Sequence, residues 1–305
     1  MTVKPASLPT QPVAPTRRPP HIIMRSIALM KPVTWFAPAW AFLCGAIASG
    51  QASWGLADLG RTFLGMILAG PIVCGLSQVI NDYCDRDVDA INEPQRLIPS
   101  GLVSTKQVFI TIAVLVGLSL GIALILGEVV TLLTAVGMVL AVGYSANPVR
   151  AKRNGWLGNT FVAISYEGLP WLAGHASFAE LSVVSIALAA LFSFGTHGIM
   201  TINDFKSIEG DRKVGINTIP ALYGPDLAAT MVVLTMSISQ LLVMMTLVAY
   251  GRGWAGLIVA LLLVLQVPLQ LRFIREPVAG AIRFSASASG LFVLGMLVAA
   301  IAVAG

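Results

Sequence analysis

Two acidic motifs contain most of the residues in this chain that could do chemistry. The first reads NDYCDRDVD (residues 81–89), and the second reads NDFKSIEGD (residues 203–211). Each follows a long apolar run, opens with Asn, Asp and an aromatic residue, and lies 122 residues from the other. This repetition predicts that a four-helix unit occurs twice in the fold.

The spacing of the acids predicts a binding site for a divalent cation. If each motif continues its helix by two turns, Asn81, Asp85 and Asp89 share one face, and Asp204 and Asp211 lie close together on the other helix. Crowded carboxylates repel one another, and a bound cation removes that cost. Mg²⁺ prefers one or two carboxylates together with phosphates and water. The residues that we expect to bind the metal are Asn81, Asp82, Asp85, Asp89, Asp204 and Asp211, and the five carboxylates are the expected catalytic groups.

Basic residues near the motifs complete a site for a diphosphate, because guanidinium and ammonium groups bind phosphate oxygens strongly. The expected diphosphate-binding residues are Arg86, Arg150, Lys152, Arg153, Lys206 and Arg212, with Lys213 beside them. A solvated loop would explain the charges of either motif alone. The repetition at matched spacing disfavours that explanation.

The composition places these motifs in a membrane protein. Of the 305 residues, 56% are apolar and 11% are charged, against about 25% charged in soluble domains. The mean hydropathy of +0.84 also excludes a water-soluble globule. The net charge of +5 is typical of basic cytoplasmic loops in such a protein, so we expect a lipid bilayer and no nucleic acid as partner.

Nine apolar runs predict an all-α polytopic protein, since only helices satisfy a lipid-exposed backbone in a chain of this pattern. The runs are 33–57, 62–81, 107–127, 129–149, 156–174, 181–202, 227–250, 254–271 and 284–304. Residues 1–31 are Pro-rich and predict a disordered basic tail, and residues 32–305 predict one transmembrane domain. All Lys and Arg except Arg61 and Arg252 fall on the N-terminal side of this topology, which makes the N-terminus cytoplasmic.

The first motif resembles that of the UbiA-type intramembrane prenyltransferases, N-D-x-x-D-x-x-x-D, and matches it in full. The resemblance implies nine transmembrane helices around a central cavity, capped by the loops after the second and sixth spans. The second family motif is often D-x-x-x-D. Here Ser207 takes its first position and Asp211 its last, so we expect Asp204 to replace the missing ligand.

Further stretches resemble the chlorophyll and bacteriochlorophyll synthase branch of that family. They are KPVTWFAPAW (31–40), NDYCDRDVDAINEP (81–94), IPSG (98–101), NGWLGN (154–159), GLPWLAGH (168–175) and NDFKSIEGDRKVGINTIP (203–220). Glu167 and residues 31–50 favour the bacteriochlorophyll side. The resemblance implies Mg²⁺-dependent esterification of the ring-D propionate of bacteriochlorophyllide a with geranylgeranyl or phytyl diphosphate, in a cytoplasmic or intracytoplasmic photosynthetic membrane.

Several alternatives stay open at this stage. Chlorophyllide could be the acceptor, as could an aromatic quinone precursor or haem, and pigment-biosynthesis or photosystem-assembly proteins are candidate partners. A secondary transporter also shows repeats and interrupted helices. Transporters place their ionisable groups at mid-membrane, however, whereas these acids gather at one membrane face.

Five further residues are expected to contact substrate. Asn81 and Asn203 open the two motifs, and Glu167 is the one carboxylate deep in a predicted span, where such groups are usually functional. His197 could ligate the central Mg of a macrocycle, and Tyr144 could stabilise cationic charge through its ring. The alternatives are an interhelical hydrogen bond for Glu167 and ordinary helix packing for His197 and Tyr144.

Overall fold

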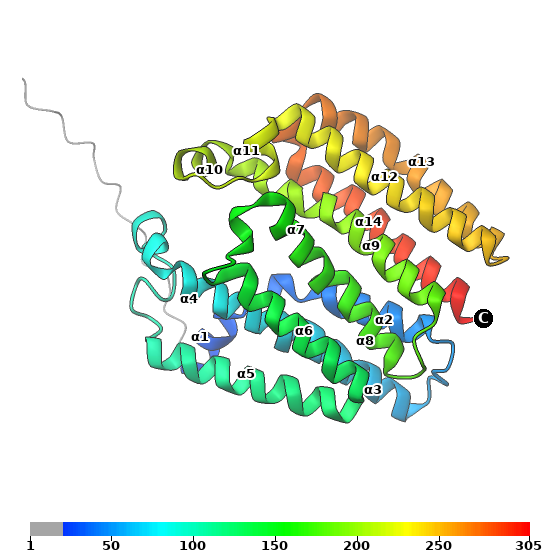
Figure 1. Cartoon of the computed structure of the whole chain (residues 1–305), viewed down its shortest axis with the longest axis horizontal. Coiled ribbons are helices and arrows are strands. Elements are labelled where there is room, and N and C mark those ends of the chain that lie inside the picture. Colours follow the sequence, from blue (N-terminus) through cyan, green and yellow to red (C-terminus); the bar gives the residue numbers. More distant parts are fainter. Residues whose placement is uncertain (1–20) are drawn as a thin grey trace, which may run out of the picture.

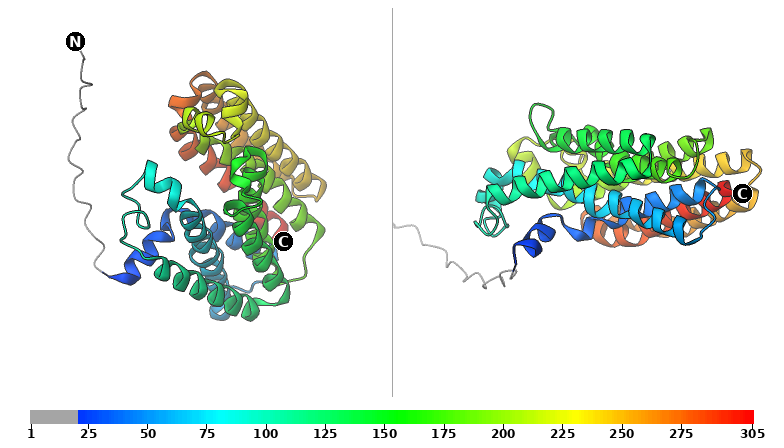
Figure 2. Two further views of the ribbon diagram at one scale, coloured as in Figure 1. Left: turned by 60° about the vertical axis from the view of Figure 1, so that its left-hand side comes forward. Right: turned by 90° about the horizontal axis from the view of Figure 1, so that it is seen from below.

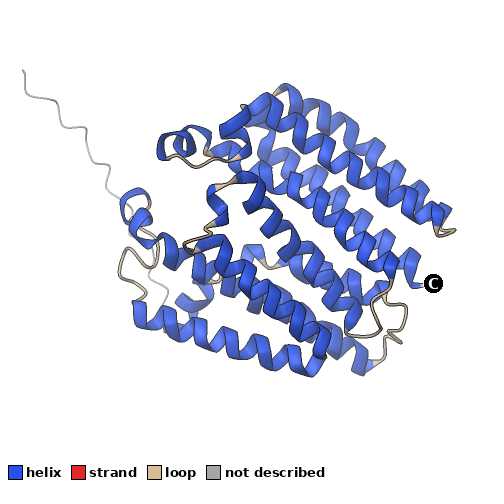
Figure 3. Ribbon diagram, in the orientation of Figure 1, coloured by secondary structure: helices blue, strands red, loops and turns tan. Residues whose placement is uncertain are grey.

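The computed structural model describes residues 21–305, and within them the secondary structure is helical apart from one isolated bridge between Asn154 and Asn217 (Figure 3). The main helices are α2 (Phe36–Ala48), α3 (Leu56–Ile67), α4 (Gly75–Asn92), α5 (Thr105–Leu126), α6 (Glu128–Ser145), α7 (Gly155–Ala163), α8 (Leu169–Ala176), α9 (Val183–Thr201), α12 (Pro225–Ala249), α13 (Gly253–Arg275) and α14 (Pro277–Ala304). The short ones are α1 (Ile22–Leu29), η1 (Pro32–Thr34), η2 (Leu68–Cys74), η3 (Ala151–Arg153), η4 (Ile164–Gly168), η5 (Ile202–Lys206), α10 (Ile208–Val214) and α11 (Ile219–Tyr223). The all-α prediction is confirmed.

The long helices run side by side (Figure 1). α4, α10 and α11 are labelled at one end of the bundle, and the C-terminus lies at the opposite end. The two further views show the same bundle, with α1 projecting from it (Figure 2). Both acidic motifs therefore belong to the same end of the bundle.

The exact number of nine spans is not confirmed. Seven helices among the described residues are long and apolar enough to cross a membrane, or eight if the bent pair Ile22–Leu29 and Pro32–Ala48 forms one span. The predicted span at 156–174 corresponds to α7, η4 and α8, where Asn159, Glu167 and His175 reduce the apolar character. The structure supports a multi-pass membrane protein.

The predicted tail differs from the structure over its last residues. Residues 1–20 lie outside the described part of the chain, but α1 forms within the segment that was expected to be disordered. Contacts with α5 fix this helix, because the amide of Gln107 donates to the carbonyl of Ile22 at 3.0 Å and to Ser26 Oγ at 3.1 Å. The Pro-rich composition before residue 21 concealed this short amphipathic helix.

Two π-helical segments interrupt the helices that carry and face the first motif. η2 contains Pro71 and lies between α3 and α4, and η4 lies between α7 and α8. Proline has no backbone N–H, which loosens the hydrogen-bond ladder and favours such a bulge. The two segments lie close together, since the Cys74 thiol is 3.3 Å from the Tyr166 hydroxyl. They form part of the wall of the central cavity described below.

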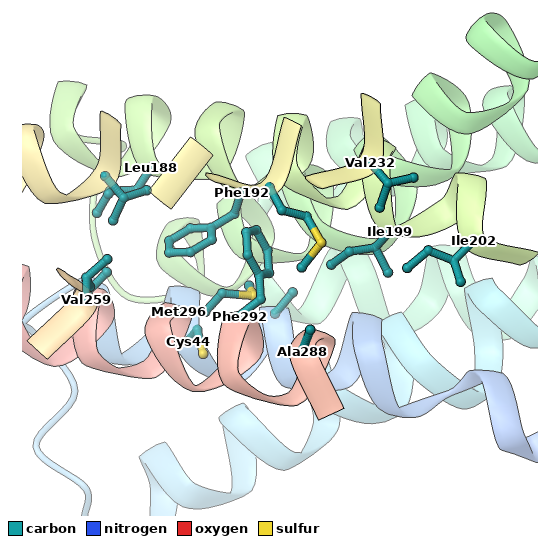
Figure 4. Close-up of a cluster of buried hydrophobic side chains, with 14 of the residues drawn as sticks. Cys44, Leu188, Phe192, Ile199, Ile202, Val232, Val259, Ala288, Phe292 and Met296 are labelled. Atoms are coloured by element: carbon teal, nitrogen blue, oxygen red, sulfur yellow. The ribbon is translucent and has the colours of Figure 1, made fainter. Parts of the chain in front are cut away.

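The largest buried cluster joins α9, α12 and α14 (Figure 4). The Phe192 ring stacks on Trp171 and meets Phe292 edge to face, with centroids 5.7 and 5.6 Å apart. Aromatic pairs of this kind add about 0.5–1.5 kcal/mol beyond their buried area. This cluster anchors α9, which leads into the second acidic motif.

Helices α2 and α8 approach closely because glycines line their contact. A Cβ on Gly174 would lie 2.0 Å from the Phe42 carbonyl oxygen, and one on Gly45 would lie 1.9 Å from that of Trp171. Small residues allow this approach between membrane helices. We expect Gly174→Ala to destabilise the protein by about 1–3 kcal/mol, seen as a lower unfolding midpoint in detergent. Gly121→Ala is the control, since a Cβ there meets no atom within 4 Å, and equal midpoints for the two variants would contradict the close packing.

Candidate active site

A cavity of about 440 Å³ lies between the helices and reaches the acidic motifs. Apolar side chains such as Val73, Leu140 and Phe161 form much of its wall. Its polar lining comes from Thr34, Cys74, Ser77, Gln78, Asn81, Tyr144, Asn159, Ser165, Tyr166, Asn203 and Asp204. The expected central cavity is present, and it brings the first two residues of the second motif to the same space as Asn81.

The first motif continues its helix as the spacing predicts, because α4 extends to Asn92. Asp82 and Asp89, seven residues apart on α4, are both buried. Lys31 Nζ donates to Asp82 Oδ1 at 2.7 Å, and Arg96 Nη1 lies 2.9 Å from Asp89 and 3.8 Å from Asp82. Buried carboxylates require such partners, and here the partners are cations.

Asp85 faces a different pair of cations. Lys152 Nζ lies 2.5 Å from its carboxylate, and Arg150 Nη2 lies 3.1 Å from it. Arg150 Nε is buried and has no hydrogen-bond partner among the described residues. An anion with several oxygens, such as a diphosphate, could supply the missing acceptor.

The second motif does not continue its helix by two turns, so that prediction is wrong. α9 gives way to η5, and the backbone leaves helical geometry at Ser207 before α10 begins. Asp204 consequently faces the cavity, whereas Asp211 sits on α10. Ser207 Oγ and Thr218 Oγ1 donate to the Asp211 carboxylate at 2.9 and 3.0 Å. Ser207, which stands where the family often has an acid, thus orients the remaining one.

The donor chemistry of these residues fits a hard divalent cation, since carboxylate oxygens are the ligands that Mg²⁺ uses. Within residues 21–305 no three carboxylates lie close enough to form a ready metal site. The reason is that Asp82, Asp85 and Asp89 each turn toward a Lys or Arg. If these ion pairs opened, the carboxylates would be free to bind a metal ion and the Lys and Arg side chains would be free to bind a phosphate.

The predicted diphosphate-binding cations have different surroundings. Lys152 and Arg150 lie at the motif, as described above. Arg86 instead lies over the Tyr83 ring, 4.4 Å from its centroid, and pairs with Asp87. Arg153, Lys206 and Arg212 are exposed and make no ion pair within the described part of the chain, and their roles stay predictions.

The other substrate-binding candidates separate into two groups. Asn81, Asn203 and Tyr144 line the cavity, and Asn81 also donates to Ser145 Oγ at 3.3 Å. Glu167 is buried, but it is not among the residues that line the cavity, and its Oε2 has no hydrogen-bond partner in residues 21–305. His197 lies on a separate groove outside this cavity.

Sequence reasoning missed three residues at the site. Lys31 and Arg96 pair with the first motif, and Gln78, one turn before it, bonds the Tyr166 hydroxyl at 3.1 Å. Burial lowers the pKa of Arg96, but the Glu93 hydrogen bond and the charges of Asp89 and Glu93 raise it above its ordinary value. Gln78 could have been found from its helical register with Asp82. Lys31 could not, because it lies 51 residues from Asp82 in the sequence, and Arg96 lies seven residues after Asp89 but beyond the end of α4 at Asn92.

Substitution of Lys152 tests the prediction that basic side chains near the first motif bind the diphosphate. We expect Lys152→Met to raise the KM for a prenyl diphosphate about tenfold or more, because a charge-assisted contact to phosphate is lost. Steady-state kinetics at fixed acceptor concentration measure this. Lys106→Met is the control, since Lys106 is exposed at the start of α5. A KM that rises equally in both variants would contradict the assignment.

Comparison with known proteins decides the family. The family model described as "UbiA prenyltransferase family" matches residues 36–295. The chain belongs to the UbiA prenyltransferase family. As a member it is a prenyltransferase, and divalent-metal dependence is typical of the family.

This UbiA-family chain is similar in sequence to two curated relatives and in fold to a solved structure. It is 56% identical over 282 residues to the "Bacteriochlorophyll synthase 34 kDa chain" of Chloroflexus aurantiacus, covering 92% of this chain and 91% of that one. It is 40% identical over 284 residues to "Chlorophyll synthase, chloroplastic" of Oryza sativa, covering 90% and 76%. The structure of a UbiA homologue from Archaeoglobus fulgidus bound to GPP and Mg²⁺ matches with a TM-score of 0.68 at 20% identity, covering 91% and 99%.

Proposed function

We propose that this protein esterifies the ring-D propionate of bacteriochlorophyllide a with geranylgeranyl or phytyl diphosphate and releases diphosphate. The observation that carries the proposal is the 56% identity to a bacteriochlorophyll synthase chain over most of both sequences. The 40% identity to chlorophyll synthases makes chlorophyllide the second candidate acceptor. The site supports both, since each acceptor presents the same carboxylate.

The two acidic motifs are the proposed metal-binding groups. Asp82, Asp85 and Asp89 would hold Mg²⁺ from α4, and Asp204 and Asp211 would hold it from the opposite side. Bound Mg²⁺ neutralises charge on a diphosphate and makes it a better leaving group. The basic side chains supply the rest of the anion site: Arg150 and Lys152 would transfer their hydrogen bonds from Asp85 to the diphosphate oxygens.

The reaction forms a bond between a propionate oxygen and C1 of the prenyl chain. The bond from C1 to the diphosphate oxygen breaks, and its electron pair leaves with the diphosphate. A propionate has a pKa near 4.3, so it arrives ionised and no strong base is required. The apolar cavity wall would exclude water that could otherwise trap the cationic carbon, and the Tyr144 and Tyr166 rings would stabilise that charge.

We propose further that residues 32–305 act as one transmembrane domain in a bacterial inner or intracytoplasmic photosynthetic membrane. The clustering of Lys and Arg at the end of the bundle that carries the acids supports a cytoplasmic N-terminus. A water-soluble prenyl diphosphate head would then meet the motifs from the cytoplasm. Pigment-biosynthesis or photosystem-assembly proteins are proposed as neighbours in that membrane.

An acceptor comparison tests the proposed function. Membranes from a non-photosynthetic host that expresses the chain receive Mg²⁺, geranylgeranyl diphosphate and one of three acceptors: bacteriochlorophyllide a, chlorophyllide a or 4-hydroxybenzoate. We expect a prenyl ester from bacteriochlorophyllide, seen by chromatography. Product from chlorophyllide alone would show that chlorophyllide, and not bacteriochlorophyllide, is the acceptor. Product from 4-hydroxybenzoate alone would contradict the proposal that the acceptor is a pigment precursor.

A further inference from the structure

A second hollow lies on the outside of the bundle, and we call it the α7–α9 groove. It has a volume of about 540 Å³, and none of its lining residues is shared with the central cavity. Its floor is built from small residues: Ala163, Gly168, Ala189, Ala190 and Ser193. Its rim includes the exposed apolar side chains of Trp156, Ile186 and Phe194, which face lipid in a membrane-spanning bundle.

Helices α7 and α9 separate this groove from the acidic motifs. The amide of Asn159 donates to Thr201 Oγ1 at 2.9 Å, and Thr160 contacts His197 one turn away. The loops beyond them are joined as well, because Gly155 N–H donates to the Asn217 carbonyl at 2.8 Å. A molecule in the groove is therefore kept apart from the reacting groups of the cavity.

His197 lines the groove at the end nearer the second acidic motif, and one of its ring nitrogens has no hydrogen-bond partner among the described residues. We assign the proton of the Thr160 hydroxyl to the Trp156 carbonyl, 2.8 Å away, which makes the hydroxyl the acceptor of the N–H of His197 Nδ1 at 3.2 Å. Nδ1 then carries the proton and Nε2 does not. Nε2 is buried and has no partner within residues 21–305. A histidine with Nδ1–H held by an oxygen and Nε2 free has the arrangement of a metal ligand.

The remainder of the groove does not suit a bare metal ion, because no Asp, Glu or Cys lines it. It suits a metal that arrives inside an apolar macrocycle and needs one axial donor. Lys and Arg are also absent from the lining, so an ionised carboxylate would enter without a partner at a high cost. Esterification removes that charge. Along α9 the groove extends from Ile186 to His197, roughly 16 Å at 1.5 Å per residue, and its apolar lining gives an isoprenoid chain a surface to lie along.

We propose that the α7–α9 groove binds the esterified Mg-tetrapyrrole product, with His197 Nε2 as axial ligand to its Mg and the isoprenoid chain along the small-residue floor. This inference rests on the proposed function for the identity of the product. The groove would hold the finished pigment at the lipid face, outside the cavity where the ester forms. The Trp156 ring, stacked on His197 with centroids 5.5 Å apart, must shift to admit the macrocycle.

The test is a binding titration of the purified full chain in lipid nanodiscs with bacteriochlorophyll a. The absorption band and resonance Raman lines that report the coordination number of Mg are the readout. We expect saturable binding with one added axial nitrogen ligand. His197→Leu should remove that signature and weaken binding at least tenfold. Ala190→Phe, at an exposed position of the floor, should weaken binding without touching His197, which keeps the test valid if the first variant misfolds.

Two matched ligands and one matched variant sharpen the result. Bacteriopheophytin a lacks Mg, and bacteriochlorophyllide a lacks the chain and carries the carboxylate, so both should bind at least tenfold more weakly. Equal binding of either ligand, or an unchanged spectrum in His197→Leu, would overturn the proposal. Asp85→Asn should bind the pigment like the parent. Pigment binding in a chain that forms no ester would refute the proposed function alone, whereas ester formation without His197-dependent binding would refute this inference alone.

Discussion

Asp85→Asn should lower kcat/KM for prenyl transfer by at least about a thousandfold while the protein stays folded in the membrane. Asn keeps the size of the side chain but loses the charge that would hold the metal, and electrostatic groups of this kind contribute factors of about 100 to 1,000 each. Asp85 now pairs with Arg150 and Lys152, so its loss also leaves two cations without their partner. Ester formation with saturating Mg²⁺ measures the effect.

Asp87 provides the matched control on the same helix. Its side chain is 82% exposed, and its ion-pair partner is Arg86 at 3.4 Å. Asp87→Asn removes the same charge two residues away, on the solvent side of α4. Activity within about twofold of the parent is expected. A large loss in Asp87→Asn, or retained activity in Asp85→Asn, would contradict the assignment of the first motif.

Asp204→Asn should be the second most damaging change, with a loss of about a hundredfold or more. Asp204 lines the cavity from η5, and we propose that it replaces the acid that is absent at position 207. A weaker apparent affinity for Mg²⁺ should accompany the loss, because one oxygen ligand would be missing. Kinetics over a series of Mg²⁺ concentrations separate this effect from poor folding.

Glu209→Gln is the control for the second motif, since Glu209 is exposed on α10. Ser207→Asp adds an informative comparison, because it restores the common family acid. If Asp204 has replaced that acid, Ser207→Asp should recover part of the activity of Asp204→Asn. Full activity in Asp204→Asn would instead assign the second motif to Asp211 alone.

Much of the fold follows from simple patterns in the sequence. The apolar runs predict the helices, and α4 continues through the first motif to Asn92 as the spacing of its acids predicts. The acids do not share all their contacts, because Asp85 turns toward Arg150 and Lys152, whereas Asp89 shares Arg96 with Asp82. The sequence does not show the break at Ser207. In the structure the helix is interrupted there, and the Ser207 hydroxyl donates to the Asp211 carboxylate. Thr218, seven residues after Asp211 and directly before α11, also donates to the Asp211 carboxylate.

The candidate site was predictable in its residue types and less so in its contacts. Asn81, Asn203, Asp204 and Tyr144, all expected at the site, line one cavity. Lys31 pairs with Asp82 across 51 residues of sequence, and no local spacing reveals such a pair. His197 illustrates the reverse case: its residue type suggested a ligand, but only the structure places it outside the cavity.

The most direct test of the account follows the oxygen of the broken bond. Geranylgeranyl diphosphate carrying ¹⁸O between C1 and phosphorus is incubated with Mg²⁺, bacteriochlorophyllide a and membranes that contain the protein. Mass spectrometry then locates the label. We expect a prenyl ester without ¹⁸O and released diphosphate that carries all of the label, because the propionate supplies both ester oxygens. An ester that retains the label would contradict transfer of the prenyl group, and the absence of any ester would contradict the proposed reaction.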